Sequence, residues 1–328
     1  VKDVDIEVFG ITPEKLKEIL SPHFKLDLVG LSFGVIKLHH LDIDISLPRK
    51  ESKRALGHKG FDIKSDPSLS IEEAASRRDF TVNAIYLDPL TGEYEDPWNG
   101  REDLKNGVLR HVSEKFAEDP LRVLRGMQFV ARFGLEPHPS TVGLCRKMSI
   151  ENLPPERLME EWKKFILKGK WMSRGLDFLR RTGWVRHFPE LSRLIGCRQA
   201  PEWHPEGDVW EHTKCCLDAF AENRTGDERE DMIVGLAVLC HDFGKPLCTL
   251  YDEVKRRIVS RGHDELGVEL RNRLVARRDL MAELDPGHPT WVALYQVEDL
   301  PFYLGTFDVI GTDPYPICQL GNPPISQV

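Results

Sequence analysis

The sequence lacks the marks of several classes of protein. No stretch of its 328 residues approaches the ~18 consecutive apolar residues of a membrane-spanning helix. Its first residues do not show the cationic, apolar and small-residue segments of a secretion signal. Its seven cysteines include no Cys-x-x-Cys pair, which excludes common zinc-finger spacings and favours reduced thiols over a disulfide framework. We therefore expect a cytoplasmic protein with no membrane partner.

Basic residues are also fewer than acidic residues. With 45 lysine and arginine residues against 53 acidic residues, the formal net charge is −8, which excludes a protein that binds polyanions over its whole surface. Basic clusters remain at 49–54, 180–186 and 256–278, and they could follow the backbone of a structured RNA. Solvated helix and loop faces are the simpler interpretation of each cluster.

The N-terminal part of the chain has the pattern of an α/β head. The chain is long enough for two or three globular domains. Around a helix expected at 13–20, apolar residues indicate strands at 4–8, 25–29, 34–38 and 41–45, and a short charged loop follows.

Helical patterns dominate the rest of the chain. Ser70 and Glu73 have the spacing of a capping box, so we expect a helix from there to about residue 86. Helical periodicity continues from 119, a break falls at 201–205, and a Pro/Gly-rich tail follows a second helical region.

Two pairs of aspartates stand in the predicted strands of the head. Asp3 and Asp5 alternate with apolar residues, and strand geometry points alternate side chains to opposite faces, so the two carboxylates share one face. Asp42 and Asp44 repeat this pattern. Because Mg²⁺ prefers carboxylate oxygens and substrate phosphates, the pairs predict a magnesium site for phosphoryl transfer. An amphipathic edge strand with solvated acids is the alternative.

Longer strings of residues carry a more specific signal. Residues 77–84 read RRDFTVNA and residues 118–125 read EDPLRVLR, and they occur in order with KDVDIEVFG, DPWNGREDL and PERLMEEWKK. Together these strings resemble the bacterial tRNA nucleotidyltransferase and poly(A) polymerase family, in particular the class II type of CCA-adding enzyme. The resemblance covers roughly residues 2 to 165.

The resemblance implies an α+β fold. A small mixed-sheet nucleotidyltransferase head would span 1–90 and be truncated at its N-terminus. An all-α neck and body at 91–200 would recognise the nucleotide and bind tRNA, an all-α HD-type domain would span 201–285, and 286–328 stays unassigned. Family members carry a Gly-Gly-x-Val-Arg-Asp segment that binds the triphosphate before the paired aspartates, and this chain begins at Val1 without it.

The same resemblance implies roles for single residues. Asp3 and Asp5 would hold the catalytic Mg²⁺, and Asp44 would be the third catalytic carboxylate. The nucleotide would be bound by six residues, with the second and third positioning its sugar: Arg78, Asp79, Asn83, Asp119, Arg122 and Arg125.

The spacing of Asp119 and Arg122 suggests how a base would be selected. Three apart on a helix, they would project to one side as an acceptor beside a donor. Cytosine and adenine offer an amino donor next to a ring-nitrogen acceptor, whereas uracil and guanine present the reverse pattern. C and A would then be chosen without a template. Alternatively, Asp119 caps a helix that Pro120 begins, and Arg122 is a surface cation.

A second group of residues lies in the C-terminal half. His212 in WEHTKC, His241-Asp242 in LCHDFGK and His263 in RGHDE resemble the HD phosphohydrolase superfamily, and WHPEGDVWEHT resembles the HD domain appended to some bacterial CCA-adding enzymes. Such imidazoles and carboxylates can hold a second divalent metal that activates water. Histidines hydrogen-bonded within a helical core are the alternative. Because their spacing fits no zinc pattern, we interpret the nearby cysteines as buried core thiols: Cys215, Cys216, Cys240 and Cys248.

These resemblances predict one activity and leave others open. The predicted activity is template-independent addition of C and A from CTP and ATP to the 3′ end of tRNA, dependent on Mg²⁺ and releasing pyrophosphate. Addition of CC alone, of A alone or of a poly(A) tail stays open because the head motifs are shared. A metal-dependent phosphohydrolase that acts on 2′,3′-cyclic or 2′-phosphates beside a degenerate RNA-binding head stays open, as does a non-catalytic RNA-binding protein. Oligomeric state stays open.

Overall fold

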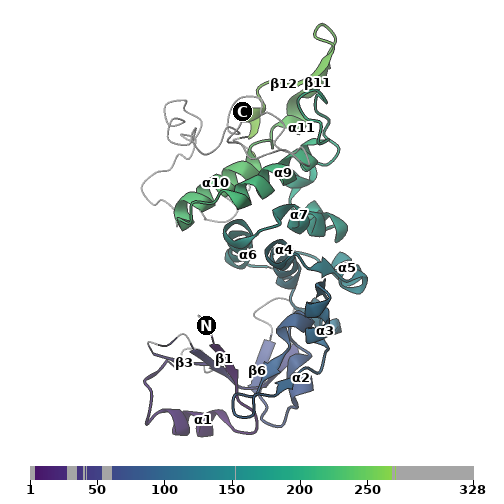
Figure 1. Ribbon diagram of the computed structural model, residues 1–328. Coiled ribbons are helices and arrows are strands. Elements are labelled where there is room, and N and C mark those ends of the chain that lie inside the picture. Colours follow the sequence, from purple (N-terminus) through teal and green to yellow (C-terminus); the bar gives the residue numbers. More distant parts are fainter. Residues whose placement is uncertain are drawn as a thin grey trace. The chain divides into compact units, whose positions relative to one another are not determined.

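The computed structural model describes residues 4–27, 35–39, 41, 43–53, 61–151, 153–267 and 270. These residues divide into two compact units (Figure 1). The first unit extends to Asp119 and includes the short segment Glu151–Leu153, and the second comprises Pro120–Ile150 and the residues from Pro154 on.

The first unit contains a mixed β-sheet, as expected. Its strands are β1 (Val4–Glu7), β2 (Leu26–Asp27), β3 (Val35–Leu38), β4 (Ile43–Ser46), β5 (Arg49–Lys53), β6 (Phe61–Ser65), β7 (Tyr86–Leu87), β8 (Tyr94–Glu95) and β9 (Val108–Leu109). Among the described residues, β1, β4, β3 and β2 form one sheet in that order, with β1 parallel to β4 and the other neighbours antiparallel. A strand is thus observed at each place predicted in the head, while residues 28, 29, 34 and 42 of the predicted ranges lie outside the described residues. β5 pairs antiparallel with β6 where we expected a loop, and β7 pairs with β8.

Helix α1 (Pro13–Leu20) covers one face of this sheet and begins where predicted. Thr12 Oγ1 accepts a hydrogen bond from the backbone N–H of Lys15 at 3.3 Å, and proline fits the first helical position because no donor is needed there. The buried core between α1 and the sheet consists of Leu16, Ile36, Leu38, Ile45 and Leu47. Because side chains alternate along each strand, the charged residues between these positions face the other side. Figure 1 shows α1 beside β1 and β3.

Helix α2 (Ile71–Ala75) is shorter than predicted. The capping box is present, because Ser70 Oγ accepts from the Glu73 N–H at 3.1 Å and the Glu73 carboxylate accepts from the Ser70 N–H at 2.9 Å. The prediction of a helix to about residue 86 is wrong, since Ala75 ends it. The next residues form a turn and the 3₁₀ helix η3 (Thr81–Asn83). Local hydrogen bonds to the Asp79 side chain compete there with helical ones.

Helix α3 (Gly100–Lys105) begins at a close backbone contact. The Asp96 carboxylate accepts hydrogen bonds from the N–H groups of Gly100 and Arg101 at 2.7 and 2.9 Å. A Cβ on Gly100 would lie 2.0 Å from the Thr81 carbonyl oxygen, so only glycine fits here. The DPWNG part of its motif therefore serves to pack α3 against η3. A further 3₁₀ helix, η4 (Glu114–Glu118), lies near the end of this unit.

The second unit consists mainly of helices. They are α4 (Leu121–Phe133), α5 (Pro139–Arg146), α6 (Pro155–Lys168), α7 (Met172–Arg181), η5 (Trp184–His187), α8 (Pro189–Ser192), α9 (Val209–Glu222), α10 (Glu228–Cys240) and α11 (Lys245–Cys248). α4 packs against α6 and α7, while α9 packs against α7 and α10. Large buried side chains such as Phe165, Phe178 and Trp184 fill the interior.

The regions expected to be all-α also contain strands. Two-residue strands β8, β9 and β10 (Glu136–Pro137) occur between 91 and 200. In the segment expected to form an all-α HD-type domain, β11 (Thr249–Asp252) and β12 (Arg257–Ser260) pair as an antiparallel hairpin. The all-α prediction is wrong at these places. β-branched and aromatic residues in the hairpin, such as Tyr251, Ile258 and Val259, favour strand conformation.

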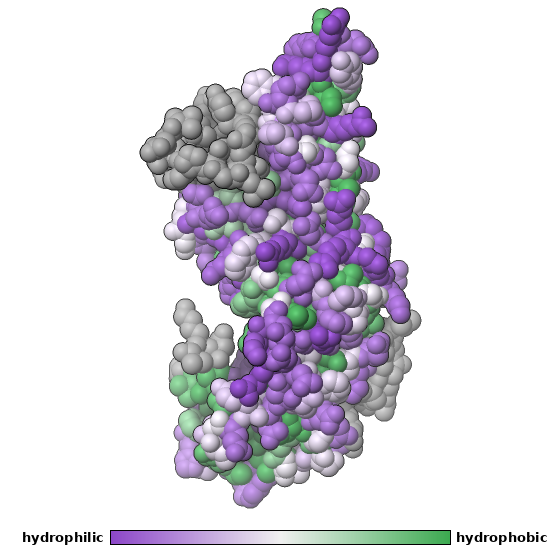
Figure 2. Space-filling model, turned by 45° about the vertical axis from the view of Figure 1, so that its right-hand side comes forward, coloured by the Kyte–Doolittle hydropathy of each residue, from purple (hydrophilic) through white to green (hydrophobic). Residues whose placement is uncertain are grey.

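The surface and the cysteines bear on two further expectations. Among the described residues, no helix is both long and apolar enough to cross a membrane. Figure 2 shows a face on which hydrophilic residues predominate and hydrophobic residues form small patches. The free thiols of the described residues are Cys145, Cys197, Cys216, Cys240 and Cys248.

Replacing Gly100 by alanine is expected to destabilise the first unit by about 1–3 kcal/mol or more, because overpacking forces the backbone of α3 away from Thr81. Urea unfolding followed by circular dichroism measures the change. Gly143→Ala is the control, because Gly143 lies in α5 and a Cβ there would have nothing within 4 Å. Equal unfolding midpoints for Gly100→Ala and the wild type would contradict the assigned contact.

Candidate functional sites

The carboxylates of the head form a row across the sheet. Parallel pairing of β1 with β4 sets Asp5 directly beside Asp44, and antiparallel pairing of β4 with β3 sets Asp44 beside Lys37. Directly paired residues project to the same face, here the face opposite the core residue Ile45. Lys37 Nζ lies 3.1 Å from Asp44 Oδ2, and both side chains are partly exposed. The row therefore presents two carboxylates and one ammonium group at the surface of the sheet.

The other predicted aspartates of this pair of strands lie outside the described residues. Asp3 precedes Val4, and Asp42 precedes Ile43. The roles predicted for Asp5 and Asp44 require that their carboxylates be close enough to share an ion, and their in-register positions on neighbouring strands satisfy that requirement at the level of the backbone.

Arg78 is held by β1. Its guanidinium donates to Glu7 Oε2 at 3.1 Å, and the Tyr86 hydroxyl donates to the same oxygen at 2.9 Å. The guanidinium also lies over the Tyr86 ring, 5.7 Å from its centroid. Glu7 is two residues from Asp5 and so lies on the same face of β1. Arg78 is therefore fixed beside the carboxylate row, at a position that sequence reasoning gave it only by resemblance.

Asp79 and Asn83 form a local pair. Asp79 is buried, and its Oδ1 accepts from the Phe80 N–H at 2.8 Å and from Asn83 Nδ2 at 3.1 Å. This arrangement fixes the orientation of the Asn83 amide, which leaves its oxygen as an acceptor and its second amide hydrogen as a donor. The structure thus brings these two predicted residues together, and their contact with a sugar stays a prediction.

Asp119 does not lie on the same helix as Arg122. α4 begins at Leu121, and Asp119 has extended dihedral angles of −121° and 102°. The premise that both residues project from one helix is wrong, because the X-Pro bond before Pro120 disfavours helical geometry for the preceding residue. Asp119 belongs to the first unit, whereas Arg122 and Arg125 belong to the second.

Arg125 is part of a charged contact between α4 and α6. Its Nη1 lies 3.9 Å from Oε1 of the buried Glu161, and Lys164 Nζ lies 2.9 Å from the same oxygen. The Arg125 guanidinium also lies over the ring of Phe129, 5.5 Å from its centroid. These contacts limit its side-chain freedom, which prepares it for a defined partner.

The histidines and aspartate of the C-terminal half form a buried cluster. Asp208 caps α9 by accepting from the Glu211 N–H at 2.9 Å, and His212 follows in the first turns of that helix. α10 ends at Cys240, so His241 and Asp242 come directly after it. Asp242 Oδ2 lies 3.2 Å from His241 Nε2 and 3.9 Å from His212 Nε2. The structure therefore brings together three predicted residues from two helices.

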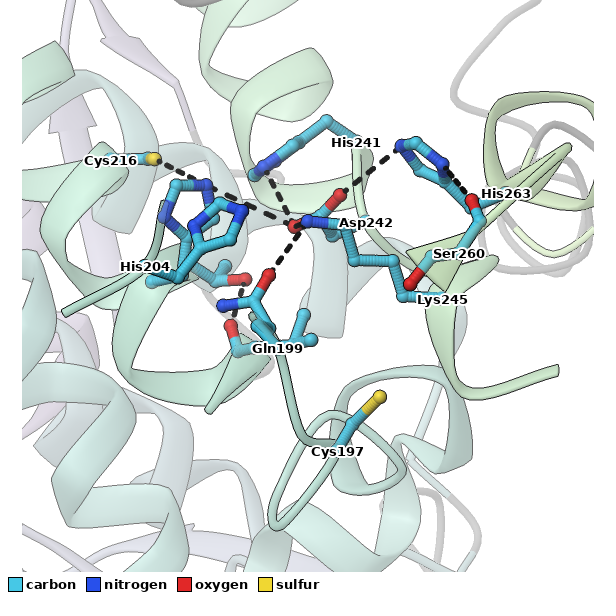
Figure 3. A network of polar contacts seen from close by, with 12 residues as sticks. Cys197, Gln199, His204, Cys216, His241, Asp242, Lys245, Ser260 and His263 are labelled. Carbon is cyan, nitrogen blue, oxygen red and sulfur yellow. Dashed lines mark hydrogen bonds and ion pairs between the residues drawn. The ribbon is translucent and has the colours of Figure 1, made fainter. Parts of the chain in front are cut away.

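His263 joins this cluster from the hairpin side. Its Nε2 lies 3.7 Å from Asp242 Oδ1, and its Nδ1 lies 2.7 Å from the Ser260 carbonyl oxygen. Figure 3 shows His241, Lys245 and His263 turned toward Asp242.

Sequence reasoning misses two members of the cluster. Glu206 Oε1 accepts from His212 Nδ1 at 2.6 Å and lies 3.1 Å from His204 Nδ1. Lys245 Nζ lies 2.8 Å from Asp242 Oδ2 and donates to Gln199 Oε1 at 2.7 Å. The spacing of Asp242 and Lys245 is a signal that could have found the second contact, because residues three apart are neighbours in a helical turn. Glu206 lies in the quoted string WHPEGDVWEHT, but no spacing rule connects it to His212.

The charges of the cluster compensate one another. Burial opposes ionisation of Asp242, yet His241 and Lys245 hold the pKa of its carboxyl well below the usual range. Burial likewise opposes ionisation of Glu206, but hydrogen bonds from His204 and His212 lower the pKa of this carboxyl. Burial lowers the pKa of His212, which favours the neutral imidazole. Burial raises the pKa of the Cys216 thiol to about 12.

The two sites offer different donor atoms to a cation. The row on the sheet offers carboxylate oxygens at a partly exposed surface, which fits Mg²⁺. The cluster offers imidazole nitrogens with a carboxylate in a buried setting, which fits a divalent transition metal. His212, Cys216 and His241 each place one possible ligand atom within 4.8 Å of the others.

Comparison with known proteins adds the class of the head. Residues 1–110 match the family described as the poly A polymerase head domain, and residues 134–195 match the probable RNA and SrmB-binding site of polymerase A. The first 110 residues are thus similar in sequence to a polymerase A head domain.

Curated proteins include similar chains. A multifunctional CCA protein of Acinetobacter baumannii is 38% identical over 277 residues, which cover 82% of this chain and 63% of the relative. A multifunctional CCA protein of Chromobacterium violaceum is 38% identical over 273 residues, with the same coverage of both chains. The chain therefore spans less than two thirds of the length of these relatives. The chain is thus similar to multifunctional CCA proteins over most of its own length.

Solved structures show the same fold. The Bacillus stearothermophilus CCA-adding enzyme in complex with CTP has a TM-score of 0.55 at 22% identity, covering 92% of this chain and 65% of that one. The Thermotoga maritima CCA-adding enzyme complexed with tRNA-CCA has a TM-score of 0.51 at 21% identity, covering 95% of this chain and 68% of that one. The mixed α+β fold predicted from the sequence is thereby confirmed.

Tyr86 is expected to ionise unusually late. Burial, with the Glu7 carboxylate nearby, raises the pKa of Tyr86 from 10.0 to about 12, although Arg78 acts in the opposite direction. Because the pKa is raised in the folded state, the stability that this phenol contributes is complete below pH 10.0 and is lost as the pH rises to about 12.

A phenolate absorbance titration of the wild type and Tyr86→Phe measures this shift. The variant should lack the phenol that ionises with a pKa of about 12. Titration curves that coincide at their alkaline ends would refute the shift.

Proposed function

We propose that this chain adds C and A nucleotides from CTP and ATP to the 3′ end of tRNA without a template. The observation that carries the proposal is the in-register pairing of Asp5 and Asp44 on neighbouring parallel strands, with Arg78 held on the same face of β1. The similarity to multifunctional CCA proteins supports the choice of substrate. We also propose that the protein is located in the cytoplasm.

The proposed chemistry is an in-line phosphoryl transfer. Asp5 and Asp44, with Asp3, would hold Mg²⁺, which when bound supplies positive charge for attack by the tRNA 3′-hydroxyl on the α-phosphate and for departure of pyrophosphate. Arg78 would donate to the triphosphate, because its guanidinium is kept charged and oriented by Glu7 and Tyr86. Asn83, oriented by Asp79, would position the sugar. Correct placement of the reacting groups provides the rest of the acceleration.

Selection of the base is assigned to Asp119 and Arg122, with Arg125 as a further nucleotide contact. An acceptor and a donor suit the amino group and ring nitrogen of cytosine and adenine, and a mismatched base would leave polar groups unpaired. Because Asp119 lies outside α4, the donor and acceptor pattern of the two side chains is the remaining support for this role. Poly(A) synthesis is the related alternative, which product length would reveal.

The division of the chain into a head at 1–90, a neck and body at 91–200, an HD-type domain at 201–285 and a tail at 286–328 is part of the same proposal. The body would bind tRNA, in keeping with the polymerase A RNA-binding match at 134–195.

Replacing Asp5 by asparagine is expected to lower nucleotide incorporation by roughly a hundredfold or more, because several kcal/mol of metal-borne charge stabilisation are lost. The measurement is incorporation of labelled CTP and ATP into tRNA lacking its 3′ CCA by the full-length protein.

Glu18→Gln serves as the matched control, since Glu18 lies on α1 with 70% of its side chain exposed. Incorporation by Asp5→Asn at the level of this control would end the proposal.

A second candidate function comes from the buried cluster. His212, His241 and Asp242 converge within a few ångströms, with Asp242 Oδ2 3.2 Å from His241 Nε2 and 3.9 Å from His212 Nε2. These residues would hold a second divalent metal in an HD-type phosphohydrolase acting on 2′,3′-cyclic or 2′-phosphates.

His241→Ala is expected to lower hydrolysis of 2′,3′-cyclic AMP by roughly a hundredfold or more, because the imidazole that would hold the water-activating metal is removed. The same variant should keep nucleotide incorporation, whereas Asp5→Asn should show the opposite pattern. An unchanged rate of hydrolysis in His241→Ala would contradict the proposed phosphohydrolase activity.

A further inference from the structure

We propose that Cys216 is a metal ligand in the buried cluster and that the cluster therefore prefers a thiophilic transition ion such as Zn²⁺ to Mg²⁺. The proposal rests on the metal site of the second candidate function and names one more ligand and the class of ion. It replaces the interpretation of Cys216 as a core thiol.

The position of the sulfur is the first argument. Cys216 Sγ lies 3.4 Å from His212 Nε2, because the two residues are one turn apart on α9. Tetrahedral zinc with bonds of about 2.0 Å to nitrogen and about 2.3 Å to sulfur would separate these two atoms by about 3.5 Å. The nitrogen of His241 completes a group whose ligand atoms lie within 4.8 Å of one another.

The orientation of the two imidazoles is the second argument. His212 Nδ1 donates to Glu206 Oε1 at 2.6 Å, and His241 Nδ1 lies 2.8 Å from the Val238 carbonyl oxygen. Each Nδ1 therefore carries a proton, so Nε2 is the atom of each ring that would bind an ion. A carboxylate or carbonyl behind a histidine is the usual support of a metal-binding imidazole.

The positions of the two Nε2 atoms are the third argument. Both Nε2 atoms lie near Asp242 Oδ2, at 3.2 Å for His241 and 3.9 Å for His212. Nitrogen, oxygen and sulfur donors from α9 and from the end of α10 thus surround one small region. Figure 3 shows Cys216 and His241 on the same side of the Asp242 carboxylate, opposite His263.

Burial alone does not distinguish this thiol. Cys145 and Cys216 have exposed fractions of 0% and 3%, and both are free thiols. Cys145 lies on α5, where its carbonyl oxygen accepts from the Trp184 indole. Cys216 differs because its sulfur contacts an imidazole nitrogen that is itself positioned by a buried carboxylate.

The charge balance also fits a divalent ion. On coordination, the Cys216 sulfur would give an electron pair to the ion while its proton leaves to solvent. Asp242, Glu206 and the Cys216 thiolate then carry three negative charges. The ion and the Lys245 ammonium, 2.8 Å from Asp242 Oδ2, carry three positive charges. Buried charges persist when they are paired in this way. A thiolate selects softer ions, whereas Mg²⁺ prefers oxygen ligands.

The test uses the full chain, stripped of metal and titrated with Co²⁺ as a spectroscopic probe. The wild type should develop a thiolate-to-cobalt charge-transfer absorption in the near ultraviolet. Cys216→Ser should lose that absorption and bind Zn²⁺ roughly 10–100-fold more weakly in chelator competition. The control Cys145→Ser should keep both properties, since it removes a buried thiol outside the cluster.

A second pair of variants separates this proposal from the metal site itself. Glu206→Gln should keep the absorption but weaken Zn²⁺ binding about 10–100-fold, because the carboxylate orients His212 and does not touch the ion. His241→Ala should abolish binding. Co²⁺ binding that depends on His241 but lacks the thiolate absorption would overturn the role of Cys216 and leave the metal site standing. An absence of Co²⁺ binding in the wild type would overturn both.

Alkylation provides a measurement that needs no cysteine variant. If Cys216→Ser does not fold, mass spectrometry of the wild type can count maleimide labelling of each cysteine with and without Zn²⁺. Protection of Cys216 that disappears in His241→Ala supports ligation. Labelling of Cys216 at the same rate with and without saturating Zn²⁺ would refute it.

Discussion

The parallel pairing of β1 with β4 is the constraint on which the proposed polymerase chemistry depends. It sets Asp5 beside Asp44 although the two strands are far apart in the sequence. The register is fixed from the other face of the sheet, where Ile45 packs with Leu16 of α1. A shift of one residue would turn Asp44 into that core and expose Ile45, at a large cost in free energy. The hydrophobic core beneath the sheet thus determines which acidic residues meet above it.

Local signals predicted much of the fold, and long-range contacts account for most of the rest. The helix at 13–20 and the capping box at Ser70 could be predicted because Thr12, Ser70 and Glu73 act within one turn of the chain. The end of α2 could not be predicted, because it depends on the hydrogen bonds that the Asp79 carboxylate accepts from Phe80 and Asn83. The β5–β6 hairpin was missed because a charged strand such as RKESK shows no alternation of apolar residues.

The same difference between local signals and long-range contacts applies to the candidate sites. Paired aspartates at alternate positions predicted a carboxylate face, and the structure sets Asp5 and Asp44 side by side. The contact of Glu7 with Arg78 and Tyr86 joins residues separated by more than 70 positions. No local sequence pattern can therefore predict this contact. Cys216 is one turn from His212, yet its importance depends on Glu206 behind that histidine. A spacing rule alone therefore undervalued the thiol, since it does not include the orientation of the neighbouring ring.

The ion pair between Lys37 and Asp44 has a consequence for how the surface of the sheet accepts a metal. A tethered ammonium group serves there as a resident counterion, 3.1 Å from the carboxylate. A metal that bound Asp44 as proposed would exchange one positive partner for another and would not neutralise a bare charge, so release of the lysine would offset part of its electrostatic gain. The released ammonium keeps its positive charge and remains attached to β3. In the proposed reaction, that ammonium group would then be available to the negative charge that a substrate brings to the same surface.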